Sequence, residues 1–223
     1  MAVDPFSLKQ MSKANLSRIV LTAGFRAADQ AAKIAFPFVG TWKKQVVSPV
    51  EGYPQEDTAV VPEQMGALIE ALNAFEDEQG VIVEIGSYRG VTTRELATRT
   101  RHKIFAIDPF MGYGGAETDL ELFQSRVVDL PHVTHLRKTS GAAARDWAHG
   151  SISFVFIDAV HDYANTWFDA LTWGSMVHPG GFIAFHDIDS RRYAGTHLAA
   201  ARFGRGHEVF RRVEGLVIFR KPN

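Results

Sequence analysis

The feature that most constrains the fold is the short apolar run Val81-Ile82-Val83-Glu84-Ile85, which passes into a turn at Gly86. A run of β-branched residues of this length is typical of a strand buried on both faces, as in parallel sheets covered by helices. Glycine allows backbone dihedrals closed to other residues, and a helix starting near Val91 offers free N–H groups. Open α/β sheets bind ligands at this end of their strands, so the turn is predicted to hold a small polar molecule.

The turn lacks the fingerprint of dinucleotide-binding proteins. Its two glycines stand in a G-x-x-x-G spacing, and a carboxylate at the strand end would repel a pyrophosphate but suits a cationic or hydroxyl-rich ligand. The pattern E-I-G-S-Y-R-G resembles the first motif of class I S-adenosylmethionine (SAM) methyltransferases, E/D-x-G-x-x-x-G. The alternative is an ordinary strand–turn–helix. The resemblance implies that four residues of the motif contact the cofactor: Glu84, Gly86, Ser87 and Gly90.

A second buried strand, residues 103–107, ends at Asp108. Asp108 follows Gly86 by about 20 residues, the spacing at which such folds place the acid that binds the ribose hydroxyls. A carboxylate accepts two hydrogen bonds from a vicinal diol, which accounts for the residue type. An acid that caps the next loop is the alternative.

Two further loops are candidate cofactor contacts. The glycine-rich segment after the second acid carries two aromatic residues, and we expect Pro109 and either Phe110 or Tyr113 to pack near cofactor or substrate. Plain loop packing is the alternative for the aromatic residues. Residues 133–136 are a third strand. In the methyltransferase family the turn after this strand contacts the adenine, so the resemblance implies this role for Ser140.

Two more apolar strands, residues 152–157 and 182–185, each end at polar residues. If the strands are parallel neighbours, each delivers its polar residues to the sheet edge that carries the glycine turn. Four of these residues are therefore predicted to converge on one site: Asp158, His161, His186 and Asp187.

The segments F-I-D-A-V-H-D-Y and H-P-G-G-F-I-A-F-H-D resemble a group of small-molecule O-methyltransferases that includes macrolide-sugar enzymes and cephalosporin-hydroxylase-like proteins. The resemblance covers most of residues 84–189. It implies that His161 is the general base, that Asp158 contributes to catalysis and cofactor binding, and that a metal is bound by Asp158, His186 and Asp187.

Methyl transfer from a sulfonium is an in-line displacement, so the enzyme must align donor and acceptor and remove a proton. Histidine, with an unperturbed pKa of about 6.5, suits that proton transfer. A loop histidine bonded to Asp162 or Asp187 is the alternative for His161. The chain departs from the metal pattern at His186, where metal-dependent relatives carry an acid, because imidazole suits zinc or iron better than magnesium. Three outcomes stay open: Mg²⁺ held by the two acids and water, another divalent metal, or no metal and a histidine base.

Composition limits the other possibilities. The 223 residues, 46% of them hydrophobic, are enough for one globular core, and the formal net charge of −1 gives no electrostatic case for a nucleic-acid partner. The absence of cysteine excludes disulfides, thiolate metal sites and thiol nucleophiles. No apolar run approaches the roughly 18 residues of a membrane span, and no signal peptide is recognisable, so a cytoplasmic protein is expected.

The chain is predicted to divide into residues 1–61, a helix (12–36) and a loop forming a lid or an oligomer contact, and residues 62–223, the SAM-binding domain. Arg191, Arg192 and His197 could meet an anionic substrate, although a solvated basic turn is the simpler interpretation. Residues 208–213 and 216–220 form a hairpin that closes the sheet.

The predicted fold is a Rossmann-like, doubly wound, mostly parallel sheet with a C-terminal antiparallel hairpin, in three α/β/α layers. The predicted function is SAM-dependent methylation of a hydroxyl on a small molecule, such as a sugar or glycosylated metabolite. The protein is expected to be able to form a homo-oligomer, to bind no nucleic acid and to have no membrane span. The alternatives are a non-catalytic SAM-binding protein and a nicotinamide-dependent oxidoreductase, the latter disfavoured by the missing third glycine and by Glu84.

Overall fold

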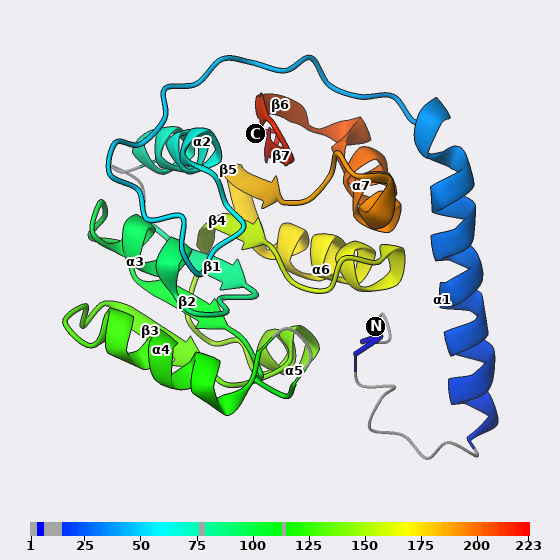
Figure 1. The fold of residues 1–223 in the computed structure, drawn as a ribbon, viewed down its shortest axis with the longest axis horizontal. Helices are drawn as coiled ribbons and strands as arrows, with labels where there is room; N and C mark the ends of the chain where they lie inside the picture. The colour runs from blue at the N-terminus through cyan, green and yellow to red at the C-terminus, as the bar shows by residue number, and fades with distance from the viewer. Residues whose placement is uncertain (1–3, 7–14, 76–78, 113–114) are drawn as a thin grey trace.

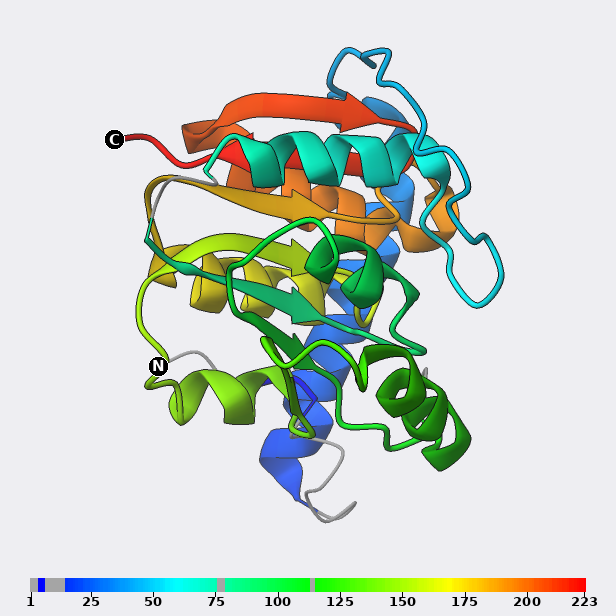
Figure 2. The same cartoon turned by 90° about the vertical axis from the view of Figure 1, so that its left-hand side faces the viewer.

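The computed structural model describes residues 4–6, 15–75, 79–112 and 115–223. A central sheet is covered by helices on both faces (Figures 1 and 2). Across the sheet, the strands of the described residues are β3 (Val133–Leu136), β2 (Ile104–Ile107), β1 (Val81–Ile85), β4 (Ile152–Ile157), β5 (Val177–Phe185), β7 (Leu216–Arg220) and β6 (Glu208–Val213). β1 to β5 are parallel, and β7 runs antiparallel to both β5 and β6. The predicted doubly wound sheet and its C-terminal hairpin are confirmed.

Each face of the sheet has its own apolar core. On one side lie α2 (Pro62–Asn73), α3 (Val91–Ala97) and α4 (Glu117–Val127); on the other lie α5 (Ser140–Arg145), α6 (Tyr163–Met176) and α7 (Ala194–Phe203). Successive residues of a strand point to opposite faces, so in β4 Phe154 and Phe156 pack under α2, while Val155 and Ile157 pack toward α6. Both faces must therefore be apolar, which explains the unbroken apolar run.

Some element boundaries differ from the predicted ones. Strand β5 begins at Val177, before the predicted strand of residues 182–185, because Gly180 and Gly181 pair with Lys221. Helix α4 begins at Glu117, where Asp119 accepts a hydrogen bond from the N–H of Ala116 and caps the start.

The N-terminal helix α1 (Leu16–Ala35) begins at Asn15, whose side chain accepts the N–H of Arg18, and packs against α6 and α7 (Figure 1). Several of its large apolar residues do not pack on the core: Leu16, Ile19, Val20 and Ile34 are 52–73% exposed, and Ala32 is the one residue of α1 that is buried. Leu21, Phe25 and Ala28 are half-buried.

Within the described residues, no helix is both long and apolar enough to cross a bilayer.

Candidate active site

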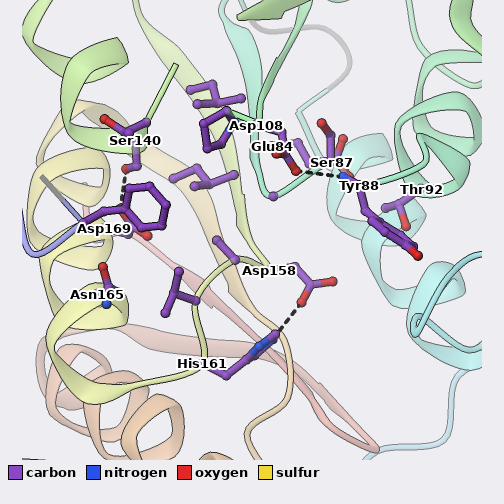
Figure 3. A pocket seen from close by; sticks show the side chains of 18 of the residues that line it. Glu84, Ser87, Tyr88, Thr92, Asp108, Ser140, Asp158, His161, Asn165 and Asp169 are labelled. Atoms are coloured by element: carbon purple, nitrogen blue, oxygen red, sulfur yellow. Dashed lines mark hydrogen bonds and ion pairs between the residues drawn. The ribbon is translucent and has the colours of Figure 1, made fainter. Parts of the chain in front are cut away.

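A cavity of about 440 Å³ opens at the carboxyl ends of the parallel strands. Figure 3 shows part of its lining, contributed by the loops after β1, β2 and β4 and by α5 and α6. Eight of the predicted site residues line it: Glu84, Gly86, Ser87, Asp108, Pro109, Ser140, Asp158 and His161.

Gly86 is required by the junction of β1 and β4. Its φ is +87°, and a Cβ there would lie 2.1 Å from the carbonyl oxygen of Asp158. Any other residue would push the two strand ends apart. This close approach to the backbone of Asp158 brings Glu84 and Asp158 to the same cavity.

Glu84 is buried, 1% exposed, at the end of β1 and accepts a short hydrogen bond from the hydroxyl of Thr93. Burial, together with the nearby carboxylates of Asp158 and Asp108, raises the pKa of Glu84 to about 8, although the Thr93 hydrogen bond opposes the shift. Glu84 is therefore mostly protonated at neutral pH in the cofactor-free protein. A cation placed beside it would reverse that, because opposite charge favours the ionised carboxylate.

Two neighbouring groups are prepared for polar contacts with a ligand. Ser87 is 5% exposed, and its hydroxyl oxygen is buried with no hydrogen-bond partner in the described part of the chain. A buried hydroxyl without a partner costs free energy, and a bound polar group would restore the bond. Asp108 accepts the N–H groups of Tyr88 and Phe110 at 3.0 and 2.9 Å, one on each oxygen, which fixes its carboxylate in the cavity wall.

Two residues predicted to contact the cofactor do not line the cavity. Gly90 is the N-cap of α3, with φ +78°, and a Cβ there would lie 2.8 Å from the ring of Phe123 in α4. Phe110 is 4% exposed and packs with Phe123 and Leu120 under α4. Both therefore serve the packing of α4. Tyr113, the other aromatic candidate, lies outside the described residues.

The four residues predicted to converge do so. One ligand atom from each of Asp158, His161, His186 and Asp187 lies within 4.8 Å of all the others. Strands β4 and β5 are parallel neighbours, and Ile157 pairs with Phe185, so the residues after them meet at one edge. Asp187 takes a positive φ of 55°, a conformation that Asp tolerates better than most residues.

His161 is held by two carboxylates. Its Nε2 lies 3.2 Å from Oδ1 of Asp158 and 3.2 Å from Oδ2 of Asp187. Because both neighbours are acceptors, Nε2 carries the proton, and Nδ1 is left with its lone pair. Nδ1 has no hydrogen bond to any described residue, and the ring packs on Tyr193 with centroids 4.6 Å apart. This is the arrangement in which an acid orients a histidine base.

His186 is buried, 2% exposed, and both of its nitrogens face oxygen. Nε2 lies 3.0 Å from the amide oxygen of Gln64 in α2, which also accepts the N–H of Val61. Nδ1 lies 3.2 Å from Oδ1 of Asp158. Burial lowers the pKa of His186, but Asp158 and Asp187 outweigh it and raise that pKa to about 9.

The charges of the cluster balance one another. Burial raises the pKa of Asp158, but His186 and His161 overcome this and hold it well below its usual range. Burial raises the pKa of Asp187, with partial compensation from His186. Without a metal, a protonated His186 supplies the positive charge between the two carboxylates.

The loop before α2 was predicted to form part of a lid or an oligomer contact, and three of its residues, Asp57, Thr58 and Ala59, line the cavity. Asn165 and Asp169 line it from α6 and were not predicted. The sequence signal for Asp169 is weak, an acid within an apolar helix.

The two arginines after Asp187 lie in solvent, as expected for a solvated basic turn. Arg191 and Arg192 are exposed, with the Arg192 guanidinium 5.4 Å from the ring centre of Tyr193. His197 is buried and its Nδ1 lies 2.7 Å from the carbonyl oxygen of Ile188, so it does not face the site.

Comparison with known proteins agrees with this geometry. Residues 83–188, which include Glu84, Asp108, Asp158 and His186, match the family described as a methyltransferase domain. This region of the chain is therefore a methyltransferase domain, and it indicates a SAM-dependent methyltransferase. A search of curated proteins gave no significant match.

Solved structures share the fold at low sequence identity. The O-methyltransferase NovP is 14% identical, with a TM-score of 0.59 over 75% of this chain and 83% of its own. An O-methyltransferase from Bacillus cereus, in complex with S-adenosylhomocysteine (SAH), is 15% identical, with a TM-score of 0.55 over 99% and 98%. An rRNA methylase from Streptococcus thermophilus is 15% identical, with a TM-score of 0.55 over 71% and 96%. The fold is thus shared by O-methyltransferases and by an rRNA methylase.

The loop over the cavity of this methyltransferase is fastened by ion pairs. Asp57 pairs with Arg89, in the turn after β1, and with Arg126 of α4, at 2.5 Å for the latter; Arg89 also pairs with Asp119 at 2.6 Å. The bonds from Arg126 and Arg89 lower the pKa of Asp57. The loop therefore lies over the cavity as long as Asp57 is held.

We expect Asp57→Ala to release SAH several-fold faster than the wild type, because the loop loses both of its charged contacts. In the wild type, raising the salt concentration should also speed release, since exposed ion pairs are screened. The variant should lose this dependence. Stopped-flow fluorescence of SAH release measures both rates, and Glu56→Ala, an exposed acid of the same loop, is the control. Unchanged release in Asp57→Ala would show that the ion pairs do not retain the cofactor.

Proposed function

We propose that this methyltransferase transfers the methyl group of SAM to a hydroxyl of a small molecule, with His161 as the general base. The observation that carries the proposal is the state of His161. Two carboxylates, each 3.2 Å away, hold its Nε2, while Nδ1 is unpaired among the described residues at the cavity edge. A hydroxyl is a poor nucleophile unless a base takes its proton as the methyl group moves.

The cavity residues have complementary roles toward the cofactor. Glu84, buried and flanked by further acids, suits the ammonium of the methionine part, and the unpartnered hydroxyl of Ser87 suits its carboxylate. Asp108 suits the two ribose hydroxyls, as the spacing to Gly86 predicted. Together they would orient the sulfonium toward His161, which is the positioning that an in-line transfer requires.

The acid and histidine cluster also fits a divalent metal, provided that it is a transition metal. Asp158, Asp187 and Nδ1 of His186 would hold it, and the amide oxygen of Gln64 fixes the proton of His186 on Nε2, as outer partners of metal-bound histidines do. Imidazole suits zinc or iron better than magnesium. Such an ion would lower the pKa of the acceptor hydroxyl.

A metal titration separates the open alternatives. We expect Zn²⁺ or Mn²⁺ to bind with at least about 10-fold higher affinity than Mg²⁺, given the imidazole ligand. Isothermal calorimetry of each ion into EDTA-treated protein, with and without SAH, measures this directly. Asp187→Asn should weaken binding, and Asp189→Asn, an acid outside the cluster, should not. Binding of no ion would leave protonated His186 as the permanent cation of the site.

The small-molecule acceptor is supported by the near-neutral charge of the chain and by the setting of His161 between Tyr193 and the cavity. The direct test is transfer of labelled methyl from SAM to a panel of sugars, glycosides and other alcohols, with bulk RNA as a parallel arm. Labelled alcohol products that disappear in His161→Ala support the proposal. Labelling of RNA alone would overturn the small-molecule acceptor, and binding of SAH with no product in any arm would favour the non-catalytic alternative.

A further inference from the structure

Asp187 lies in a left-handed backbone conformation that its surroundings must maintain. Its φ of 55° is open to Asp more readily than to most residues, but few residues with a Cβ adopt it. A residue persists in such a region only where neighbouring contacts fix it. The next residue, Ile188, is fully buried and supplies those contacts through its backbone.

The backbone of Ile188 is bonded on both sides. Its N–H, which belongs to the peptide that leaves Asp187, donates to the carbonyl oxygen of Gly215 at 3.0 Å, in the turn between β6 and β7. Its carbonyl oxygen lies 2.7 Å from Nδ1 of His197 in α7. The first bond joins two backbones and needs no particular side chain, whereas the second depends on the imidazole of His197.

The imidazole of His197 is explained by this bond better than by packing. It is 2% exposed, and its ring contacts those of Phe36 and Trp42, with centroids 5.1 and 5.9 Å apart. Because the carbonyl of Ile188 can only accept, Nδ1 carries the proton. Nε2 is buried with no hydrogen-bond partner among the described residues, which costs free energy. A phenylalanine ring would fill the same space without that cost, but it could not donate to Ile188.

Helix α7 contacts both partners of the pair formed by His161 and Asp187. Gly195 packs so closely on the start of α6 that a Cβ there would lie 2.3 Å from the first backbone nitrogen of that helix. The ring of Tyr193, which precedes α7, packs on the ring of His161. His197 stands four residues later and reaches the loop of Asp187. The helix thus fixes the loops after β4 and β5 relative to each other.

We propose that His197 is a positioning residue for methyl transfer, acting through the backbone of Ile188. Its bond holds Asp187 in the conformation that keeps the Asp187 carboxylate 3.2 Å from Nε2 of His161. The inference rests on the proposed function, in which His161 is the base. Without the bond, Asp187 relaxes toward a commoner backbone conformation, and its carboxylate leaves the imidazole. His161 then keeps one of its two orienting acids and is less well aligned with the acceptor hydroxyl.

Two substitutions separate the bond from the packing. His197→Phe keeps an aromatic ring against Phe36 and Trp42 but removes the donor, whereas His197→Asn loses the ring and keeps an N–H donor near the position of Nδ1. We expect His197→Phe to lower kcat about 10- to 100-fold, the range found for residues that orient site groups from outside. Its SAH affinity and Tm should stay close to those of the wild type. His197→Asn should keep most of the wild-type kcat, although its Tm should fall because the ring contacts are lost.

The control is His207→Phe, which makes the same change at a second histidine whose Nδ1 lies 2.9 Å from a backbone carbonyl, that of Phe203. This bond lies outside the cavity, so kcat should equal that of the wild type. A merely structural role for His197 predicts the reverse order, with full kcat in His197→Phe and the larger loss in His197→Asn, and that result would overturn the inference. Either variant decides alone if the other does not fold, because the inference requires a low kcat in His197→Phe and a retained kcat in His197→Asn.

The outcome is separable from a failure of the proposed function. Full activity of His197→Phe beside an inactive His161→Ala overturns this inference alone. Full activity of both variants removes the base itself, and this inference with it. A parallel loss of kcat and SAH affinity in His197→Phe would show a general distortion of the site, which excludes a role confined to Asp187.

Discussion

Replacing His161 by alanine should lower kcat by about 10²- to 10⁴-fold, the usual contribution of a positioned general base. SAH affinity should change little, because Glu84, Ser87 and Asp108, the residues proposed to hold the cofactor, remain. Added imidazole should restore part of the rate, since it can occupy the space left by the ring and accept the proton. Steady-state kinetics on the best acceptor and calorimetry with SAH measure the two effects separately.

The matched control is His149→Ala, which removes an exposed histidine outside the cavity. Its kcat should equal that of the wild type. A His161→Ala enzyme with full activity would exclude the base, and would leave a metal-bound or solvent-exposed hydroxyl as the only route to deprotonation. A loss of SAH binding in parallel with kcat would instead assign His161 a role in holding the cofactor.

Glu84→Gln should have two opposite effects. SAH affinity should fall roughly 10- to 100-fold, because a charged hydrogen bond to the ammonium is lost. The cofactor-free protein should become more stable at pH 7, by on the order of 1–3 kcal/mol, because the variant no longer carries a buried acid that the unfolded chain ionises freely.

The sign of the stability effect follows from the pKa of Glu84, which burial raises from 4.5 to about 8. Between these values the folded protein retains a proton that the unfolded chain releases. The contribution of Glu84 to stability is therefore greatest below pH 4.5 and declines as the pH rises toward 8. Asp169 and His186, whose pKa values are raised to about 7 and about 9, contribute to the pH dependence as well, so the difference between wild type and variant is the quantity to follow.

Denaturant unfolding from pH 5 to pH 8 measures this difference, with Glu117→Gln, an exposed acid, as the control. Calorimetry in buffers of different ionisation enthalpy should also show that SAH binding to the wild type releases a proton near pH 7, which the variant does not. If Glu84→Gln binds SAH as tightly as the wild type, the ammonium of the cofactor does not bind at Glu84. A stability difference independent of pH would mean that Glu84 is ionised in the folded protein.

Physical reasons explain which site residues the sequence predicted. Asp108 and Asp158 each follow a strand whose two faces are buried, and Glu84 is the last residue but one of a third such strand. These strands are otherwise largely apolar, so the polar residue that ends each apolar run marks the strand end, and parallel strands bring their ends to one edge. His161, His186 and Asp187 lie within four residues of a strand end, so they were placed by the same rule.

Residues farther from strand ends depended on packing. Phe110 directly follows Pro109, yet a backbone φ of 48° and the space under α4 send its ring into the core. The position of Asp57 depends on two arginines from distant segments. Asp169 reaches the cavity only because α6 turns that face toward α5. Apolar residues occupy much of the surface of α6, so the sequence alone does not indicate which face of the helix turns toward α5.

The sequence by itself determined the sheet, the strand ends and the convergence of two acids and two histidines, because burial on both faces leaves an unambiguous apolar run. Only the tertiary structure decided how those groups are used. It gave both nitrogens of His186 oxygen partners, one of them on a glutamine 122 residues away. It also left Nδ1 of His161 unpaired among the described residues. It turned Leu16, Ile19 and Ile34 of α1 outward, since side-chain directions depend on contacts between segments that sequence patterns treat separately.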